Sequence, residues 1–445
     1  MDYAAMLERL AAIPAFADKK RQKQDMLKVL ECLGNPQKQI RAVHVAGTNG
    51  KGSVCACVNA GLMAAGLKVG LYTSPYLEDF RERIRLNGKN APREQLAEIA
   101  QEVFDAADRI DAQITQFGYI TLIAFAFFAR ENIDYAVIEV GLGGTDDPTN
   151  ICMPNVCVIT SISLDHTALL GNTCGLIAAQ KAGIIKREIP VVTVKQNDEA
   201  AEVIRRAAEK CNAPLYIMKP ESIKTGWNGT DFCIDGNKAH TALIGDYQAD
   251  NAAAALKALE ILGVKNFTAY RAIENVVWPG RMQPLCSSPK VLLDGAHNPD
   301  AAKKLALFID KIGPKAVLVT GMASDKDVDR FVQTLVPAVQ SVIAVDIPSK
   351  RTMSAAELAQ RYAMYGADAQ WEKDTVKALK TAFEKAQNNG GCVVICGSLY
   401  LAGEVLTLLH GGKLPFLSNT RTQRCRYYAN ETITKAPGEA AEVKN

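Results

Sequence analysis

The sequence lacks long hydrophobic runs and an excess of charge of one sign. Its longest apolar run, residues 120–129, is too short to span a bilayer. The 445 residues include 51 Lys and Arg against 48 Asp and Glu, a net charge of +3. This balance argues against a nucleic-acid or membrane-surface partner. The first residues begin an amphipathic helix without a cationic region, so we expect no signal peptide and a cytoplasmic protein.

The sequence also lacks cysteines at the spacing of zinc ligands. It has 12 cysteines, but no CxxC pair recurs, and several cysteines lie inside apolar runs. We therefore expect reduced core cysteines and no structural zinc. Because no exposed amphipathic stripe marks an interface, a monomer is the default expectation.

The length exceeds what one hydrophobic core usually organises, so we expect two domains. Apolar runs of strand type alternate with helical patterns along the first half of the chain, which predicts an α/β fold with a mostly parallel sheet and helices on both faces. The predicted strands span 41–46, 68–73, 134–140, 155–161 and 189–194, and the predicted helices span about 51–65, 93–108, 120–131, 173–183 and 198–211.

The pattern changes near residue 215, where short polar strands and turns predict a small antiparallel appendage over 215–245. An Ala-rich helix and a Trp-Pro-Gly-Arg break follow, and then the α/β alternation restarts. We predict an N-terminal domain over 1–285, a C-terminal domain over 286–413 and a flexible tail over 414–445. The strands predicted in the second domain span 290–294, 315–320, 341–346 and 391–396.

The most informative segment, residues 41–54, reads as strand, Gly-rich loop and helix. Such a loop can bind phosphates through backbone N–H groups and a helix N-terminus. Lys51 would contact the β- and γ-phosphates, and the Ser53 hydroxyl could reach Mg²⁺. The match to a Walker A motif is imperfect, because Val45 replaces its first glycine and Gly52 separates Lys51 from Ser53. The alternative is a Gly-rich turn without a ligand.

Further polar residues follow predicted strands. Glu139 ends the strand at 134–140 and precedes a Gly-rich turn. Ligands of open α/β sheets bind outside the carboxyl ends of the strands, and a carboxylate there suits Mg²⁺. The alternative is an acid that caps a loop. Asp165 and His166 follow the next strand and should emerge at the same edge of the sheet.

Two more groups stand out. Lys181 ends a helix at Gly183, where a lysine also favours the helix dipole. Asp294 and His297 follow an apolar strand in the second half of the chain and are expected to face a cleft between the domains. The sequence has only five histidines, and three of them, His44, His166 and His297, fall in such motif-like segments.

Seven segments in this order resemble the folylpolyglutamate synthases and dihydrofolate synthases, which belong to the Mur ligase superfamily. The resemblance covers roughly residues 20–410. The segments are HVAGTNGKGSV, TSPYLEDFRERI, EVGLGGTDDPTNI, TSISLDHTALLGNT, AAQKAGIIK, WPGRMQ and DGAHNP.

The resemblance implies a fold and a reaction. The fold would be a P-loop NTPase-like Mur ligase central domain with a mostly parallel sheet, followed by a smaller Rossmann-like α/β C-terminal domain. ATP would phosphorylate a folate or dihydropteroate carboxylate, and the amine of L-glutamate would attack the acyl phosphate to form an amide. Transferring a phosphoryl group between anions requires cations and exclusion of water.

The resemblance also assigns roles to residues. Ser74, Glu139 and His166 match magnesium ligands, and Lys181 matches a lysine that the family carbamylates, which implies two Mg²⁺ sites. Asp294 and His297 match residues that close over the nucleotide and glutamate. The residues that match the ATP site are Gly47, Thr48, Asn49, Gly50, Lys51, Gly52 and Ser53 of the phosphate loop, with Asn251, Arg281 and Asp294. Those expected to take part in catalysis are Lys51, His166, Lys181, Asp294 and His297.

The chain departs from the family pattern at four positions. Tyr76 replaces a usual His, Gly118 a usual Glu, Thr145 a common Arg and Gln180 an acid. These positions lie near the acceptor or behind the site, so two alternatives stay open. One is a related ligase that uses another carboxylate acceptor, and the other is a catalytically silent nucleotide-binding protein.

Overall fold

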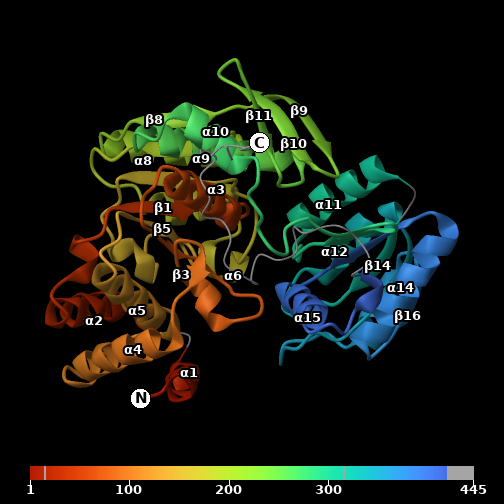
Figure 1. Ribbon diagram of the computed structural model, residues 1–445, viewed down its shortest axis with the longest axis horizontal. Helices are drawn as coiled ribbons and strands as arrows, with labels where there is room; N and C mark the ends of the chain where they lie inside the picture. The colour runs from red at the N-terminus through yellow and green to blue at the C-terminus, as the bar shows by residue number, and fades with distance from the viewer. Residues whose placement is uncertain (15–16, 314–315, 418–445) are drawn as a thin grey trace, which may run out of the picture.

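A computed structural model describes residues 1–14, 17–313 and 316–417 of the chain (Figure 1). Its N-terminal part, residues 1–282, is built on one eight-stranded sheet. The strands are β1 (Ala42–Ala46), β2 (Val69–Tyr72), β3 (Ile84–Leu86), β4 (Lys89–Asn90), β5 (Tyr135–Glu139), β6 (Val156–Ile159), β7 (Val191–Val194) and β8 (Leu215–Met218). They lie in the order β4-β3-β2-β5-β1-β6-β7-β8, and every neighbouring pair from β2 to β8 is parallel. The predicted mostly parallel sheet is confirmed.

Helices cover both faces of this sheet, as predicted. One face packs on α3 (Lys51–Ala64), α9 (Asp246–Ile261) and α10 (Asn266–Ile273). The other packs on α1 (Tyr3–Ala12), α2 (Lys19–Cys32), α4 (Arg93–Asp108) and α5 (Gln116–Arg130), with α7 (Cys174–Ala182) and α8 (Asp198–Lys210) beside β6 and β7. Short helical turns are η1 (Pro36–Lys38), η2 (Phe80–Arg83), η3 (Pro148–Ile151) and α6 (Thr167–Leu170). The two apolar faces of strands such as β1 explain why helices must cover both sides.

The predicted antiparallel appendage is smaller than expected. It consists of β9 (Glu221–Gly226), β10 (Gly229–Ile234) and β11 (Asn237–Thr241). β8 was included in that appendage, but it pairs parallel with β7 and extends the main sheet. β8 is the edge strand of this sheet and leaves Tyr216 and Ile217 exposed.

The C-terminal part, residues 283–417, contains a second sheet. Its strands are β12 (Gln283–Ser287), β13 (Lys290–Leu293), β14 (Ala316–Thr320), β15 (Val339–Ala344), β16 (Asp368–Trp371) and β17 (Cys392–Cys396), in the order β12-β13-β17-β14-β15-β16. Only β12 is antiparallel to its neighbour. The helices α11 (Pro299–Ile312), α12 (Val328–Leu335) with η4 (Val336–Ala338), and α13 (Ala355–Met364) cover one face, and α14 (Thr375–Asn389), α15 (Leu399–His410) and η5 (Pro415–Leu417) cover the other.

The structure refines two predicted boundaries. β12 begins at Gln283 and belongs to the second sheet, so we propose a domain boundary before Gln283 instead of after residue 285. The predicted tail starts too early, because Leu414 and Leu417 are buried against α14 and α15. The rest of that tail, residues 418–445, lies outside the described residues. Within the described part of the chain, no helix is both long and apolar enough to cross a membrane.

Candidate active site

The loop between β1 and α3, residues 47–53, lies where the sequence predicts a phosphate-binding loop. β1 is flanked by β5 and β6, so the carboxyl ends of these three strands meet at one edge of the sheet. The loop needs glycine at Gly47, which has φ +146°, because a Cβ atom there would lie 1.7 Å from Thr160 Oγ1. Thr160, the residue that follows β6, therefore packs directly against the loop at Gly47.

Hydrogen bonds hold the loop in place. Thr48 N donates to Ser161 O (2.9 Å), and Thr160 Oγ1 donates to Asn49 O (2.8 Å). Lys51 begins α3 and folds back so that its Nζ donates to the carbonyls of Gly47 (3.1 Å) and Thr48 (3.2 Å). The Lys51 ammonium and the N-terminus of α3 thus lie together at this loop, an arrangement that favours binding of an anion.

Glu139 is the last residue of β5 and is buried beside the loop. Its Oε2 accepts a hydrogen bond from Ser74 N (3.0 Å). Burial raises the pKa of the Glu139 carboxyl, and the nearby Lys51 ammonium opposes that rise. A buried carboxylate that needs neighbouring positive charge suits a bound cation.

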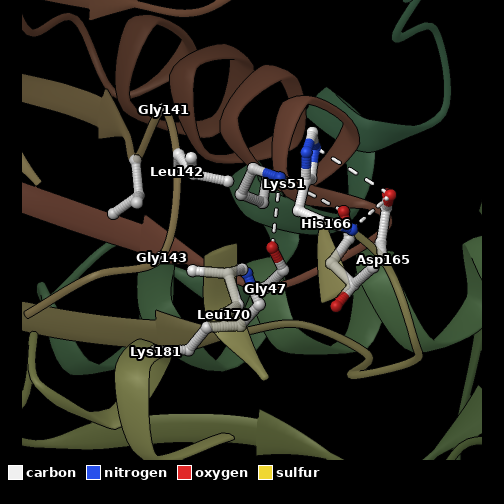
Figure 2. A pocket seen from close by; sticks show the side chains of 11 residues that line it. Gly47, Lys51, Gly141, Leu142, Gly143, Asp165, His166, Leu170 and Lys181 are labelled. Atoms are coloured by element: carbon white, nitrogen blue, oxygen red, sulfur yellow. Dashed lines mark hydrogen bonds and ion pairs between the residues drawn. The ribbon is translucent and has the colours of Figure 1, made fainter. Parts of the chain in front are cut away.

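Lys181 and His166 line a small cavity of about 30 Å³ together with Gly47, Lys51 and Gly143 (Figure 2). Lys181 is 4% exposed, and burial together with the Lys51 charge lowers its pKa from 10.5 to about 7. Gly144 makes the close approach possible, because a Cβ atom there would lie 2.9 Å from the Cα of Lys181.

A cleft of about 1070 Å³ lies between the N-terminal and C-terminal parts. From the C-terminal part, Asp294 and His297 follow β13 and line it. The Asp294 carboxylate accepts hydrogen bonds from the backbone N–H groups of Met282 (2.7 Å) and Ala296 (2.8 Å), and burial raises its pKa. The predicted site residues that line this cleft are Thr48, Asn49, Gly50, Lys51, Gly52, Ser53, Ser74, Glu139, His166, Arg281, Asp294 and His297.

His297 is held as a neutral imidazole. Its Nδ1 lies 2.8 Å from the carbonyl oxygen of Gly295, so Nδ1 carries the proton and Nε2 keeps a free lone pair. Burial lowers the pKa of His297 from 6.5 to about 4. A side chain in this state offers a hydrogen-bond acceptor to the cleft without adding positive charge.

Three predicted residues lie outside the large cleft. Gly47 and Lys181 line the small cavity next to it, and Asn251 lies behind the phosphate loop. A Cβ atom on Gly50, which has φ +94°, would lie 2.3 Å from Asn251 Oδ1, and Asn251 Nδ2 donates to Gln248 Oε1 (2.8 Å). Asn251 therefore packs against the phosphate loop at Gly50.

His44 looked like a site residue by its place in the motif, but it is a core residue. It is fully buried, and its Nε2 lies 2.8 Å from Thr149 Oγ1, which in turn donates to Asp147 Oδ1. Burial lowers the pKa of His44 from 6.5 to about 3, so this imidazole is neutral.

Sequence reasoning missed several polar residues that line the cleft. Arg83 follows the Thr-Ser-Pro segment, and its buried Nε has no hydrogen-bond partner among the residues described. The run of three arginines over 81–85 was a signal that could have identified it. The other missed residues are Gln248, Lys304, Lys326, Arg351 and Ser398.

Comparisons with known proteins cover nearly the whole chain. The Mur ligase middle domain family matches residues 45–259, and the family described as the C-terminal domain of dihydrofolate synthetase matches residues 285–408. The folylpolyglutamate synthase of Lacticaseibacillus casei is 34% identical over 439 residues, which cover 93% of this chain and 100% of that protein. The dihydrofolate synthase/folylpolyglutamate synthase of Bacillus subtilis (strain 168) is 34% identical over 410 residues, covering 85% and 93%.

A solved structure agrees with these matches. The folylpolyglutamate synthase of Mycobacterium tuberculosis, complexed with ADP and AMPPCP, superposes with a TM-score of 0.83 at 29% identity and covers 92% of this chain and 99% of that one. The fold of this chain is thus similar to that of the solved structure over nearly its whole length. The chain belongs to the family of folylpolyglutamate synthases and dihydrofolate synthases, within the Mur ligase superfamily.

Proposed function

We propose that the protein is an ATP-dependent ligase that adds L-glutamate to the carboxylate of a folate or of dihydropteroate, with release of ADP and phosphate. The observation that carries this proposal is the cleft, which brings the phosphate loop together with Asp294 and His297 of the C-terminal part. The names of the relatives and the nucleotides in the solved complex support it.

The reaction requires two anions to meet. The γ-phosphoryl group of ATP is transferred to the substrate carboxylate, and the amine of L-glutamate attacks the resulting acyl phosphate, from which phosphate leaves. Backbone N–H groups of residues 47–53 and the Lys51 ammonium would hold the nucleotide phosphates and neutralise developing charge. Arg281, which also lines the cleft, would add positive charge, and Asn251 would keep the loop in shape.

The donor set fits magnesium. Glu139 offers a buried carboxylate, Ser74 a hydroxyl, and His166 a partly exposed imidazole at the same edge of the sheet. Among the residues described, no group of three or more His, Cys, Asp and Glu forms an all-protein metal site. This agrees with Mg²⁺, which is usually held by few protein ligands together with phosphates and water. When bound, Mg²⁺ would neutralise charge on the transferring phosphoryl group.

Lys181 fits a second magnesium site only after modification. An ammonium repels Mg²⁺, whereas a carbamate supplies anionic oxygens. Carbamate formation needs the neutral amine, and a pKa of about 7 makes that form abundant at neutral pH. The added group would lie in the small cavity that Lys181 lines together with Lys51 and His166.

The C-terminal part would receive glutamate. His297 Nε2 can accept a hydrogen bond from the attacking amine, and Asp294 fixes the turn that carries His297 by binding two backbone N–H groups. The Asp294 carboxylate, which lines the cleft, would also attract the ammonium group of the incoming glutamate.

One assay tests the function. Glutamate-dependent release of phosphate from ATP is measured with dihydropteroate, with a reduced folate and without an acceptor. We expect stimulation by at least one pterin. Stimulation only by another carboxylate would indicate a ligase with a different acceptor, consistent with Tyr76 in the cleft wall. No turnover with any acceptor would indicate a silent nucleotide-binding protein.

We also propose a cytoplasmic monomer. The cysteines in the described residues are free, which agrees with a reducing compartment. Light scattering coupled to size-exclusion chromatography tests the oligomeric state, and a mass of twice the chain would refute it.

A further inference from the structure

The N-terminus of α11 contacts the N-terminal part of the molecule through two hydrogen bonds that run in opposite directions. Asn49 of the loop donates from Nδ2 to Asp300 Oδ2 of α11 (2.8 Å). Asn298, the N-cap of α11, donates from Nδ2 to Asp165 Oδ2 of the N-terminal part (3.2 Å). Each part of the molecule therefore gives one amide and receives one, across the cleft.

A carboxylate beside a phosphate loop needs compensation, and the structure supplies it. Asp300 is the second residue of α11, where the helix dipole stabilises negative charge. Lys304 lies one turn later and donates from Nζ to the same Oδ2 (2.9 Å). Asp300 and Lys304 thus form a neutral pair and do not place a net negative charge against the nucleotide.

Asn49 is a rigid partner for this bond. Its backbone oxygen accepts from Thr160 Oγ1 (2.8 Å) and Ser161 Oγ (3.3 Å), and its side-chain amide also donates to Ser163 Oγ (3.2 Å). Because the end of β6 already fixes Asn49, the bond to Asp300 restrains α11 and hence the C-terminal part. Figure 1 shows α11 at the side of that part which faces the N-terminal part.

We propose that Asp300 is a positioning residue that couples the phosphate loop to the closed arrangement of the C-terminal part. Asp300 lies six residues after Asp294 and three after His297, on the helix that their loop enters. Holding the start of α11 against Asn49 therefore sets the distance between the phosphate loop and the residues proposed to receive glutamate. The inference rests on the proposed function, but the contact itself can be tested without turnover.

The test compares Asp300→Ala with Asp300→Asn and with the control Asp198→Ala. Asn keeps an oxygen that can accept from Asn49 but loses the charge next to Lys304. Asp198 is an exposed acid in the first turn of α8, so its removal measures the general effect of losing such an acid. All variants are made in the full chain.

The kinetic readout is kcat/KM for glutamate. We expect a loss of about tenfold in Asp300→Ala, since one hydrogen bond to a charged group is removed. We expect a change within about threefold in Asp300→Asn and within about twofold in the control. Affinity for ADP alone should not weaken in Asp300→Ala. An unchanged kcat/KM, or a loss explained by weaker ADP binding, would overturn the proposal.

Hydrogen–deuterium exchange reads the contact directly. The amides of Ala301 and Ala302 are bonded to Asn298 Oδ1 (2.9 Å) and Asn298 O (3.0 Å) at the start of α11. We expect faster exchange there and in the loop over 160–165 in Asp300→Ala, but not in Asp300→Asn. If the wild type shows no ligase activity, exchange decides alone, and unchanged rates in Asp300→Ala would show that the contact does not hold the two parts together.

Discussion

Replacement of Lys181 by methionine should separate stability from activity. The side chain is 4% exposed, and its pKa falls from 10.5 to about 7, largely because of burial. This difference corresponds to about 5 kcal/mol against the buried ammonium. Methionine has a similar length and no charge. Lys181→Met should therefore be more stable than the wild type at neutral pH, while glutamate-dependent phosphate release collapses and ADP binding survives.

The sign of the pH dependence follows from linkage. Between pH 7 and 10.5 the unfolded chain binds more protons at this lysine than the folded chain, so the free energy of unfolding rises with pH in that window. From pH 7 to pH 9 the contribution is about 2–3 kcal/mol. The wild type should gain this stability as the pH rises, and Lys181→Met should not.

The assay is urea denaturation in bicarbonate-free buffer from pH 7 to pH 9, so that no carbamate forms. Lys210→Met is the matched control, because Lys210 is also a last-turn lysine, on α8, but is exposed. Adding ¹³C-bicarbonate near pH 8 should produce a carbamate resonance in the wild type that is absent from Lys181→Met. Parallel stability curves for the wild type and Lys181→Met, or wild-type turnover in the variant, would refute the reasoning.

Three further changes test the site and its support. Gly47→Ala should weaken nucleotide binding, measured by calorimetry, at least about tenfold, because the new Cβ would lie 1.7 Å from Thr160 Oγ1 and the loop must move. An unchanged affinity would show that the loop does not bind the nucleotide. Thr149→Val should lower the free energy of unfolding, measured by urea denaturation, by about 1–3 kcal/mol, since it leaves His44 Nε2 without its acceptor. An unchanged free energy of unfolding would contradict the buried hydrogen bond. The pKa of His297 is lowered to about 4, so the neutral imidazole contributes fully to stability above pH 6.5. This contribution, about 3 kcal/mol in the free energy of unfolding, is lost as the pH falls from 6.5 to 4. His297→Gln should flatten the curve of stability against pH in this range, and an unaltered slope there would refute the assignment.

The local sequence was sufficient to predict features that depend on a single helix, strand or loop. The strand–loop–helix pattern around Lys51 predicted β1, the phosphate loop and α3, because the spacing of apolar residues and the positions of glycines are visible within a few neighbouring residues. The rule that parallel strands share one carboxyl edge placed Glu139 and His166 beside that loop. The boundary of β8 was wrong because pairing with β7 is a long-range contact that an edge strand does not display in its own residues.

The remaining features depend on distant segments that meet only in the folded chain. The motif located Lys181, but its burial beside Lys51, and hence its pKa near 7, comes from the way α7 packs under the Gly-rich turn at Gly144. Asn251 lies behind Gly50 although 201 residues separate them, and Asp300 reaches Asn49 over a separation of 251. Hydrogen bonds and desolvation act over a few ångströms in space, whereas a sequence pattern records neighbours along the chain. The type of chemistry could therefore be predicted from the motifs, but the charge states and the coupling between the two parts required the tertiary structure.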